Sequence, residues 1–146
     1  MKTELKVKTF DELTNRQLYE IVRARIEIFL LEQTIICQDF DRIDYDSLHC
    51  FLEQDGEILA YLRAYRGEDG NVKIGRVLSI THGIGLGAKL MRLSIPEIQK
   101  RMPCKAFTLH AQTQAQGFYE KFGFTAVSSV FLEENIPHVA MMRENK

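Results

Sequence analysis

The sequence has few cysteines, no excess of charge of one sign and no long apolar run. Its cysteines, Cys37, Cys50 and Cys104, are odd in number and show neither a Cys-x-x-Cys spacing nor a histidine pair at zinc-finger separation. A disulfide scaffold and a structural metal site are therefore not expected. Reduced thiols are typical of the cytoplasm, which is the predicted location.

The charges of the chain nearly cancel. Its 19 basic and 20 acidic residues leave a formal charge of -1, so the chain lacks the field that gathers phosphate backbones and nucleic acid is not an expected partner. No run approaches the roughly 20 apolar residues of a membrane span, and residues 1–10 alternate charged and apolar side chains. We therefore expect neither a signal peptide nor a membrane partner.

The composition is that of an ordinary globular domain. The chain has 146 residues, of which 45% are hydrophobic and 27% charged. A chain of this length buries roughly 68 to 70% of its unfolded surface, which is enough for one core. We therefore expect a single domain over residues 1–146, without repeats or low-complexity stretches.

Hydrophobic periodicity and turn signals predict the elements. Alternating side chains predict an edge strand at 5–9, and Thr14 stands three residues before Gln17, a capping-box spacing that begins a helix over about 14–32. A long acidic loop follows over 33–47, with Arg42 as its only base. The remaining expected elements are strands over 48–53 and 57–65 around Asp55-Gly56, a strand over 72–80 with a bulge at Gly75, a helix after a glycine loop that Pro96 kinks or ends, a strand over 105–111, a helix over 114–122 stopped by Gly123, and a closing hairpin of 126–132 with 138–142 around Glu133-Glu134-Asn135.

The order of these elements predicts the topology. Three antiparallel strands form a meander, and the strand over 72–80, the following helix and the strand over 105–111 form a strand–helix–strand unit whose two strands run parallel. The expected fold class is therefore α/β, with a mixed sheet flanked by helices in three layers.

The glycine loop lies between a predicted strand and a predicted helix. Unpaired N–H groups at a helix N-terminus carry partial positive charge, so Gly83, Gly85 and Gly87 predict phosphate binding, with a tight turn alone as the alternative. A P-loop is excluded because Ala88 stands where its second glycine belongs and Leu90 where Ser or Thr is required. The loop also matches G-x-G-x-x-A, but no acidic residue ends the next strand, so a nucleotide-binding oxidoreductase is the weaker alternative.

Two motifs together carry a family resemblance. The glycine loop before its helix, followed by Phe118-Tyr119-Glu120-Lys121-Phe122-Gly123-Phe124, resembles the GNAT superfamily of acyl-CoA N-acyltransferases, and the order of elements agrees with it. The stretches that resemble its ElaA-type branch are Phe29 to Gln33, Gly75-Arg76-Val77, Gln112 to Phe124, and Ile136-Pro137-His138.

The resemblance implies a site for acetyl-CoA as cosubstrate. It places the pyrophosphate on the glycine loop and the backbone of the following residues, the pantetheine arm along the strand over 76–79, and a helix-capping amide near CoA. His82 stands where the family usually has Gln or Arg, and its imidazole can donate a hydrogen bond to phosphate. The implied cofactor-binding residues are Val77, Leu78, Ser79, His82, Gly83, Gly85, Leu86, Gly87, Ala88 and Gln112.

Acyl transfer to an amine requires a base, an oxyanion donor and a proton for the leaving thiolate. The resemblance assigns the proton to Tyr119 and the oxyanion donor to a backbone N–H near Val77 or Leu78. For the base, His138 and Glu32 rank first, with a water chain as a further alternative. The other candidates are Asp39, Asp41 and His110.

The predicted function is acetyl-CoA-dependent N-acetyl transfer, by direct attack, to a primary amine of a small molecule or peptide, without a metal. The carboxylates of Asp39 and Asp41 are expected to concentrate a cationic amine at the site. A non-catalytic acyl-CoA-binding sensor or interaction module on the same fold is the alternative. A homodimer is a common assembly for such small domains, but no residue of this chain indicates one.

Overall fold

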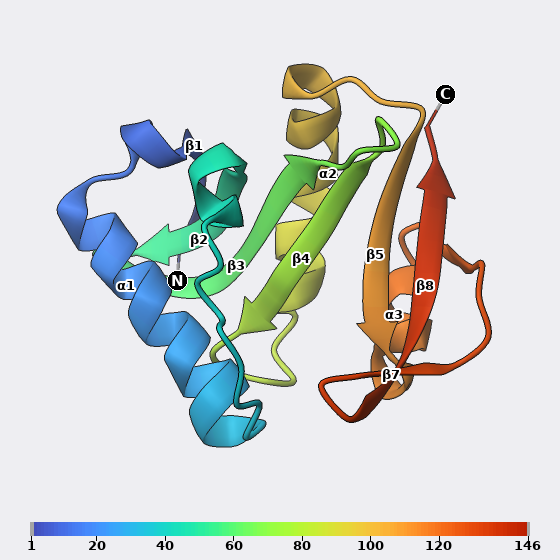
Figure 1. Ribbon diagram of the computed structural model, residues 1–146. Helices are drawn as coiled ribbons and strands as arrows, with labels where there is room; N and C mark the ends of the chain where they lie inside the picture. Colours follow the sequence, from blue (N-terminus) through green and yellow to red (C-terminus); the bar gives the residue numbers. More distant parts are fainter. Residues whose placement is uncertain (1, 146) are drawn as a thin grey trace.

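The computed structural model describes residues 2–145 as an α/β fold built on one mixed sheet (Figure 1). Its elements in chain order are β1 (Glu4–Thr9), η1 (Phe10–Glu12), α1 (Asn15–Arg25), η2 (Ile26–Glu32), η3 (Ile43–Asp46), β2 (Leu48–Gln54), β3 (Glu57–Arg66), β4 (Val72–Ser79), α2 (Leu86–Arg101), β5 (Ala106–Gln112), η4 (Thr113–Ala115), α3 (Gln116–Glu120), β6 (Thr125–Ala126), β7 (Phe131–Glu133) and β8 (Ile136–Glu144).

The strands lie in the order β1-β2-β3-β4-β5-β8-β6, with β7 paired to β8. The first four strands form the expected antiparallel meander with β1 at the edge, and Asp55 and Gly56 make the β2–β3 turn at φ values of 52° and 80°. β4 and β5 run parallel, as the strand–helix–strand order predicts.

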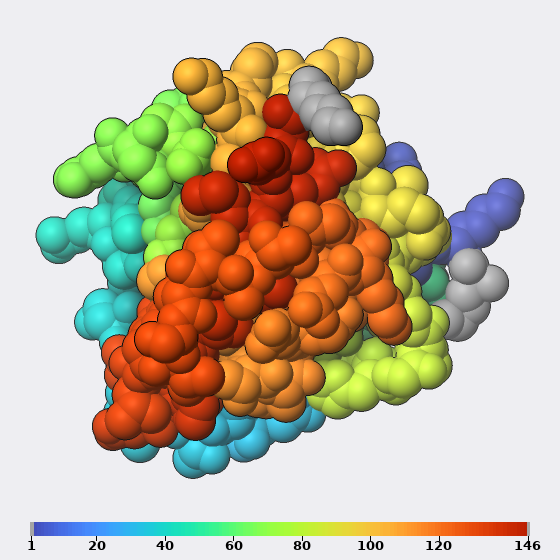
Figure 2. Space-filling view, turned by 90° about the vertical axis from the view of Figure 1, so that its right-hand side faces the viewer, coloured from blue at the N-terminus to red at the C-terminus, as the bar shows by residue number. Residues whose placement is uncertain are grey.

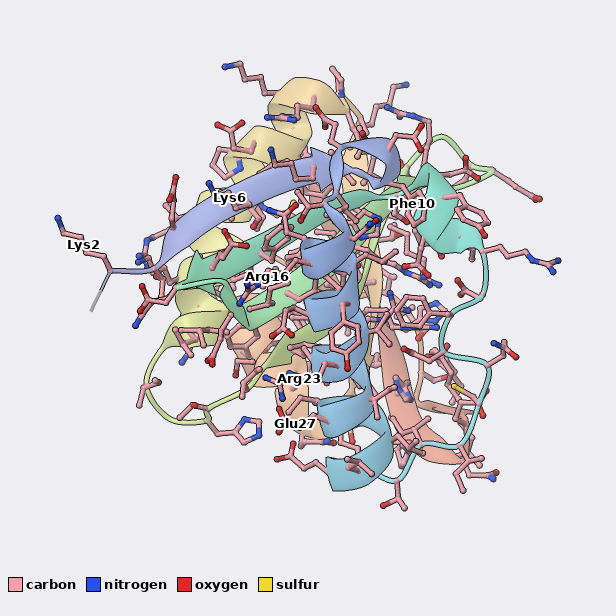
Figure 3. The ribbon with its side chains drawn as sticks, turned by 90° about the vertical axis from the view of Figure 1, so that its left-hand side faces the viewer. Lys2, Lys6, Phe10, Arg16, Arg23 and Glu27 are labelled. Atoms are coloured by element: carbon pink, nitrogen blue, oxygen red, sulfur yellow. The ribbon has the colours of Figure 1, made fainter. Side chains whose placement is uncertain are left out.

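Helices cover both faces of the sheet, which confirms the three layers. On one face α1 places Ile21 and Ala24 against β2, β3 and β4, while Arg16 and Arg23 lie on its exposed side (Figure 3). On the other face α2 packs Leu90 against the larger core cluster, which also includes Tyr119 of α3. Within residues 2–145 no helix is long and apolar enough to cross a membrane.

The first helix begins at the predicted capping box. Thr14 Oγ1 accepts a hydrogen bond from the Gln17 N–H at 3.0 Å, and Gln17 Oε1 accepts one from the Thr14 N–H at 3.0 Å. The helix extends to Glu32, as expected, but its last seven residues, η2, are π-helical. This wider spiral leads directly into the loop over 33–47 beside the site.

Two expectations are corrected. The helix α2 does not end at Pro96 but continues to Arg101, because residues on both sides of the proline, including Ile95 and Ile98, are packed into the core. At the C-terminus the expected long hairpin is short: β7 spans three residues, and β8 pairs along its length with β5. The strand β8 is therefore a central strand of the sheet.

β4 and β5 are hydrogen-bonded neighbours only at one end. Their register joins Val72 to Phe107 and Lys73 to Thr108, after which the strands diverge toward their C-terminal ends (Figure 1). The bulge that was expected at Gly75 begins directly after it. Between the pairs Arg63–Gly75 and Tyr61–Leu78, β4 has one more residue than β3. Within this bulge the left-handed backbone conformation is adopted by Arg76, at φ 54°, and not by Gly75.

Candidate functional site

A cavity of about 590 Å³ lies where β4 and β5 diverge. Four parts of the chain line it: the η2 segment with the loop over 33–40, the bulged part of β4, the end of β5 with the start of α3, and the turn between β7 and β8. Most of its walls are apolar. The polar and ionisable lining residues are Arg25, Gln33, Cys37, Gln38, Asp39, Arg76, His110, Gln112, Gln114, Tyr119, Glu133, Glu134 and His138.

The bulge leaves part of the β4 backbone free for another partner. The β3–β4 register passes from Gly75 to Leu78 without pairing Arg76 or Val77, and β5 has already separated from this part of β4. Backbone N–H and C=O groups need partners when they are covered. An extended ligand chain lying against this segment can provide them.

The glycine loop turns sharply into α2. Gly83 and Gly85 both have φ 81°, and Gly85 caps the helix. The first intrahelical hydrogen bond joins the Lys89 N–H to the Gly85 carbonyl at 3.0 Å, so the three amides before Lys89 project from the helix end. Figure 2 shows the loop in yellow-green beside the orange α3 segment, and a Cβ atom on Gly87 would lie 3.5 Å from Phe118 Cζ.

The two predicted site residues His82 and Glu32 pair with each other. The His82 Nε2 lies 3.0 Å from both carboxylate oxygens of Glu32, and both side chains are exposed. Glu32 does not line the cavity that contains Tyr119 and His138. The structure therefore separates Glu32 from His138, the other first-ranked base candidate, and places it beside the glycine loop.

Tyr119 lies in the cavity wall. It is 9% exposed and packs against the rings of Phe118 and Phe124, with centroid separations of 5.1 and 6.1 Å. Burial raises the pKa of the Tyr119 phenol well above its usual value. The hydroxyl therefore stays protonated at neutral pH and is available as an acid.

His138 is a buried residue of β8, the strand that pairs with β5 on the side away from β4. Only 7% of the residue is exposed. Its Nδ1 lies 2.7 Å from the Ile136 carbonyl oxygen, and its Nε2 lies 3.6 Å from Glu133 Oε2. The other oxygen of Glu133 lies 2.8 Å from His110 Nδ1. One carboxylate thus stands between two imidazoles.

Gln112 ends β5 at the cavity, but its side chain does not cap a helix. Its Nε2 donates to Gln33 Oε1 at 3.1 Å, and its Oε1 accepts from Gln114 Nε2 at 2.5 Å. These bonds tie the end of η2 to the end of β5. The amide is therefore at the predicted place with a different role, because it joins two walls of the cavity.

Three arginines hold the acidic loop. Arg25 contacts Asp39 and Asp44 at 2.9 and 2.6 Å. The remaining pairs join Arg63 to Asp41 at 2.8 Å and to Asp44 at 3.1 Å, and Arg76 to Asp39 at 2.7 Å and to Asp41 at 3.4 Å. Asp39 and Asp41 are therefore neutralised within the protein, which corrects the expectation that they attract a cationic amine.

The ion pairs also change how Asp41 titrates. Burial alone disfavours the charged carboxylate, but the hydrogen bonds and charge of Arg63 outweigh it and lower the pKa of Asp41 from 3.8 to about 2. The Arg25 guanidinium further stacks over the Phe40 ring, 3.9 Å from its centroid. Asp39 and Phe40, which line the cavity, are thus held in place by these contacts.

Sequence reasoning missed Glu133 and the arginines. The sequence predicted Glu133 in the turn, whereas it is the last residue of β7 and pairs with Ile136 across the Glu134-Asn135 turn. The register of β5 and β8 pairs Gln112 with His138 and His110 with Ala140, so the two histidines share one face as diagonal neighbours. Within residues 2–145 no group of side chains is arranged to hold a metal ion.

Comparisons with known proteins agree with this geometry. Residues 7–145 match the family described as an acetyltransferase (GNAT) domain. The chain is 35% identical over 139 residues to protein ElaA of Escherichia coli (strain K12), with 91% of each covered. The crystal structure of Escherichia coli ElaA has a TM-score of 0.91 at 33% identity, covering 98% of this chain and 100% of that one. The crystal structure of an acyl-CoA N-acyltransferase from Pseudomonas aeruginosa has a TM-score of 0.89 at 35% identity, covering 96% and 99%.

Proposed function

The chain belongs to the GNAT family of acyltransferases, and we propose that it transfers an acetyl group from acetyl-CoA to a primary amine of a small molecule or peptide by direct attack. The observation that carries this proposal is the cavity between the diverging ends of β4 and β5, which brings Tyr119, His138 and the unpaired β4 backbone together. The helix end formed by the glycine loop lies next to the helix that contains Tyr119.

The proposed cosubstrate site has two parts. The amides of Leu86, Gly87 and Ala88 at the α2 N-terminus suit the two negative charges of a pyrophosphate. The β4 segment from Val77 to Ser79 suits the amides of a pantetheine arm, because the bulge has left its backbone without strand partners at Val77. His82 flanks the first part, and Gln112 fixes the cavity wall opposite the second.

The proposed chemistry uses one base and one acid. The amine nitrogen loses a proton to His138 Nε2 and forms a bond to the thioester carbonyl carbon, whose oxygen becomes an oxyanion near the backbone N–H of Val77 or Leu78. The carbon–sulfur bond then breaks, and the Tyr119 hydroxyl gives its proton to the departing sulfur. We assign the base to His138 rather than Glu32, because Glu32 lies outside the cavity and faces His82.

The proposed location of the protein is the cytoplasm. The three cysteines are free thiols in the structure, which supports a reducing compartment such as the cytoplasm.

The acceptor enters from the side lined by η2, the loop over 33–40 and the β7–β8 turn, where the walls combine apolar side chains with Glu133 and Glu134.

Calorimetric titration with acetyl-CoA tests the cosubstrate, with NAD and ATP as controls. We expect micromolar binding of acetyl-CoA alone. An amine panel with detection of released CoA thiol then tests the reaction. Binding without thiol release on any amine would favour a non-catalytic acyl-CoA sensor, and absence of binding would contradict the proposal as a whole.

A further inference from the structure

Glu133 contacts both imidazoles that line the cavity, and the reaction above does not use it. Its Oε1 lies 2.8 Å from His110 Nδ1, and its Oε2 lies 3.6 Å from His138 Nε2. The side chains of His110 and Glu133 are 35% and 44% exposed, whereas that of His138 is 8% exposed. The three residues come from β5, β7 and β8, so the fold itself brings them together.

The hydrogen bonds determine the tautomer of His138. A backbone carbonyl oxygen can only accept, so the contact at 2.7 Å requires that His138 Nδ1 carries the proton. In the neutral imidazole the Nε2 atom then holds a lone pair. That atom faces Glu133, whose negative charge favours the imidazolium that forms when Nε2 takes a proton.

His110 in turn orients the carboxylate. A carboxylate oxygen also only accepts hydrogen bonds, so the N–H at His110 Nδ1 donates a hydrogen bond to Glu133 Oε1. This bond holds Oε1 and leaves Oε2 directed at His138. The His110 ring packs edge-on against Phe131, with centroids 5.1 Å apart, and the same Phe131 ring stacks on His138 at 6.2 Å. Both imidazoles are thus held by packing as well as by Glu133.

We infer that Glu133 is a positioning residue for the proposed acyl transfer: it stabilises the protonated form of His138, and His110 holds Glu133 in the orientation that does so. This inference rests on the proposed function. The amine proton passes to His138 Nε2, and the resulting positive charge is balanced by the Glu133 carboxylate beside it. His110 keeps its proton throughout.

Other charged groups share the cavity. These titratable groups are Arg25 on α1, Cys37 and Asp39 in the loop after η2, Arg76 on β4, Tyr119 on α3 and Glu134 in the β7–β8 turn. Arg25, Asp39 and Arg76 form ion pairs with one another. Within residues 2–145, Glu133 is the carboxylate that lies within 4 Å of the His138 imidazole.

Histidine NMR tests the inference without requiring activity. The chain has four histidines, so two-bond ¹H–¹⁵N spectra can be assigned with single variants. We expect the wild type to show His138 with a protonated Nδ1 and an unprotonated Nε2. In Glu133→Gln the ¹⁵N chemical shift of His138 Nε2 should change, because the carboxylate oxygen 3.6 Å from it is replaced.

The pair of His82 and Glu32 supplies a matched control. Glu32→Gln makes the same chemical change beside another imidazole at 3.0 Å. It should change the Nε2 chemical shift of His82 and leave that of His138 in place, while Glu133→Gln should do the reverse. An unchanged His138 Nε2 shift in Glu133→Gln, or a proton on His138 Nε2 in the wild type, would overturn the inference.

Kinetics separates positioning from catalysis. His138→Gln should lower kcat at saturating amine by roughly 100-fold or more. Glu133→Gln should lower kcat less and leave the KM for the amine unchanged. His110→Asn retains a donor near the Nδ1 position and should restore the activity lost in His110→Ala. If both His110 variants are equally inactive and His138→Gln is active, His110 is the base and the assignment is wrong.

The two proposals fail in different ways. If the wild type releases no thiol with any amine, the acyl-transfer proposal fails, while the NMR chemical shifts still decide whether Glu133 acts on His138. If the wild type is active and Glu133→Gln leaves the His138 Nε2 shift and kcat unchanged, the positioning role is refuted and the acyltransferase proposal stands.

Discussion

Alanine substitutions at two glycines of the loop should change stability in opposite directions. Gly85 has φ 81° and caps α2, whereas Gly87 lies within the first turn of the helix. A side chain at Gly85 forces the left-handed conformation on a residue with a Cβ atom, which costs about 1–2 kcal/mol. In the helix alanine is preferred to glycine by about 0.5–1 kcal/mol, so Gly87→Ala should be stabilising.

The space around each glycine decides the effect on binding. A Cβ atom on Gly87 would meet Phe118 Cζ at 3.5 Å, an ordinary van der Waals contact on the side of α3. A Cβ atom on Gly85 would meet nothing within 4 Å, so it would project into the open space at the helix end. That space is where the proposed pyrophosphate approaches. Gly85→Ala should therefore weaken acetyl-CoA binding more than Gly87→Ala does.

Thermal unfolding and calorimetry with the same preparations provide the assay. At about 2–4 °C per kcal/mol for a chain of this size, Gly85→Ala should lower Tm by roughly 2–8 °C and Gly87→Ala should raise it by about 1–4 °C. A lower Tm in Gly87→Ala would refute the packing argument. Acetyl-CoA affinity in Gly85→Ala equal to that of the wild type would refute the placement of the pyrophosphate.

Three further predictions concern the cavity and the core. Tyr119→Phe should lower kcat by roughly 100-fold because the thiolate loses its proton donor, with little change in acetyl-CoA affinity by calorimetry; near wild-type turnover would exclude Tyr119 as the acid. Because the pKa of Asp41 is lowered to about 2 from 3.8, its ion pairs stabilise the fold above about pH 4, and this contribution is lost as the pH falls toward 2. Urea unfolding of Asp41→Asn should accordingly show a weaker pH dependence than the wild type between pH 4 and 2, and equal slopes would contradict the ion-pair account. Burial raises the pKa of the Cys50 thiol to about 12, so a thiol reagent at pH 8 should label exposed Cys37 in the folded protein and Cys50 only after unfolding.

Local signals predicted most of the fold. The capping box at Thr14 and Gln17, the Asp55-Gly56 turn and the strand–helix–strand order depend on residues close together in the chain, and each is present in the structure. Where prediction failed, distant contacts decided the outcome. α2 passes through Pro96 because its apolar side chains are packed against the sheet, and β8 takes β5 as its main partner.

The site was predictable only in part for the same reason. The glycine loop and Tyr119 lie in short motifs, so their residue types and spacing were visible in the sequence. The pairing of Asp39 with Arg76 joins residues 37 positions apart, and that of Glu32 with His82 joins residues 50 positions apart. No local pattern contains such contacts. The neutralised acidic loop and the role of Glu133 therefore emerged only from the folded chain.

The most direct test of the central claim is the release of CoA thiol from acetyl-CoA in the presence of a panel of primary amines, measured beside His138→Gln and Tyr119→Phe. The account predicts release by the wild type with at least one amine and a loss of roughly 100-fold in each variant. Release that is equal in the wild type and both variants, or none from a wild type that binds acetyl-CoA, would contradict the claim that this cavity catalyses acetyl transfer.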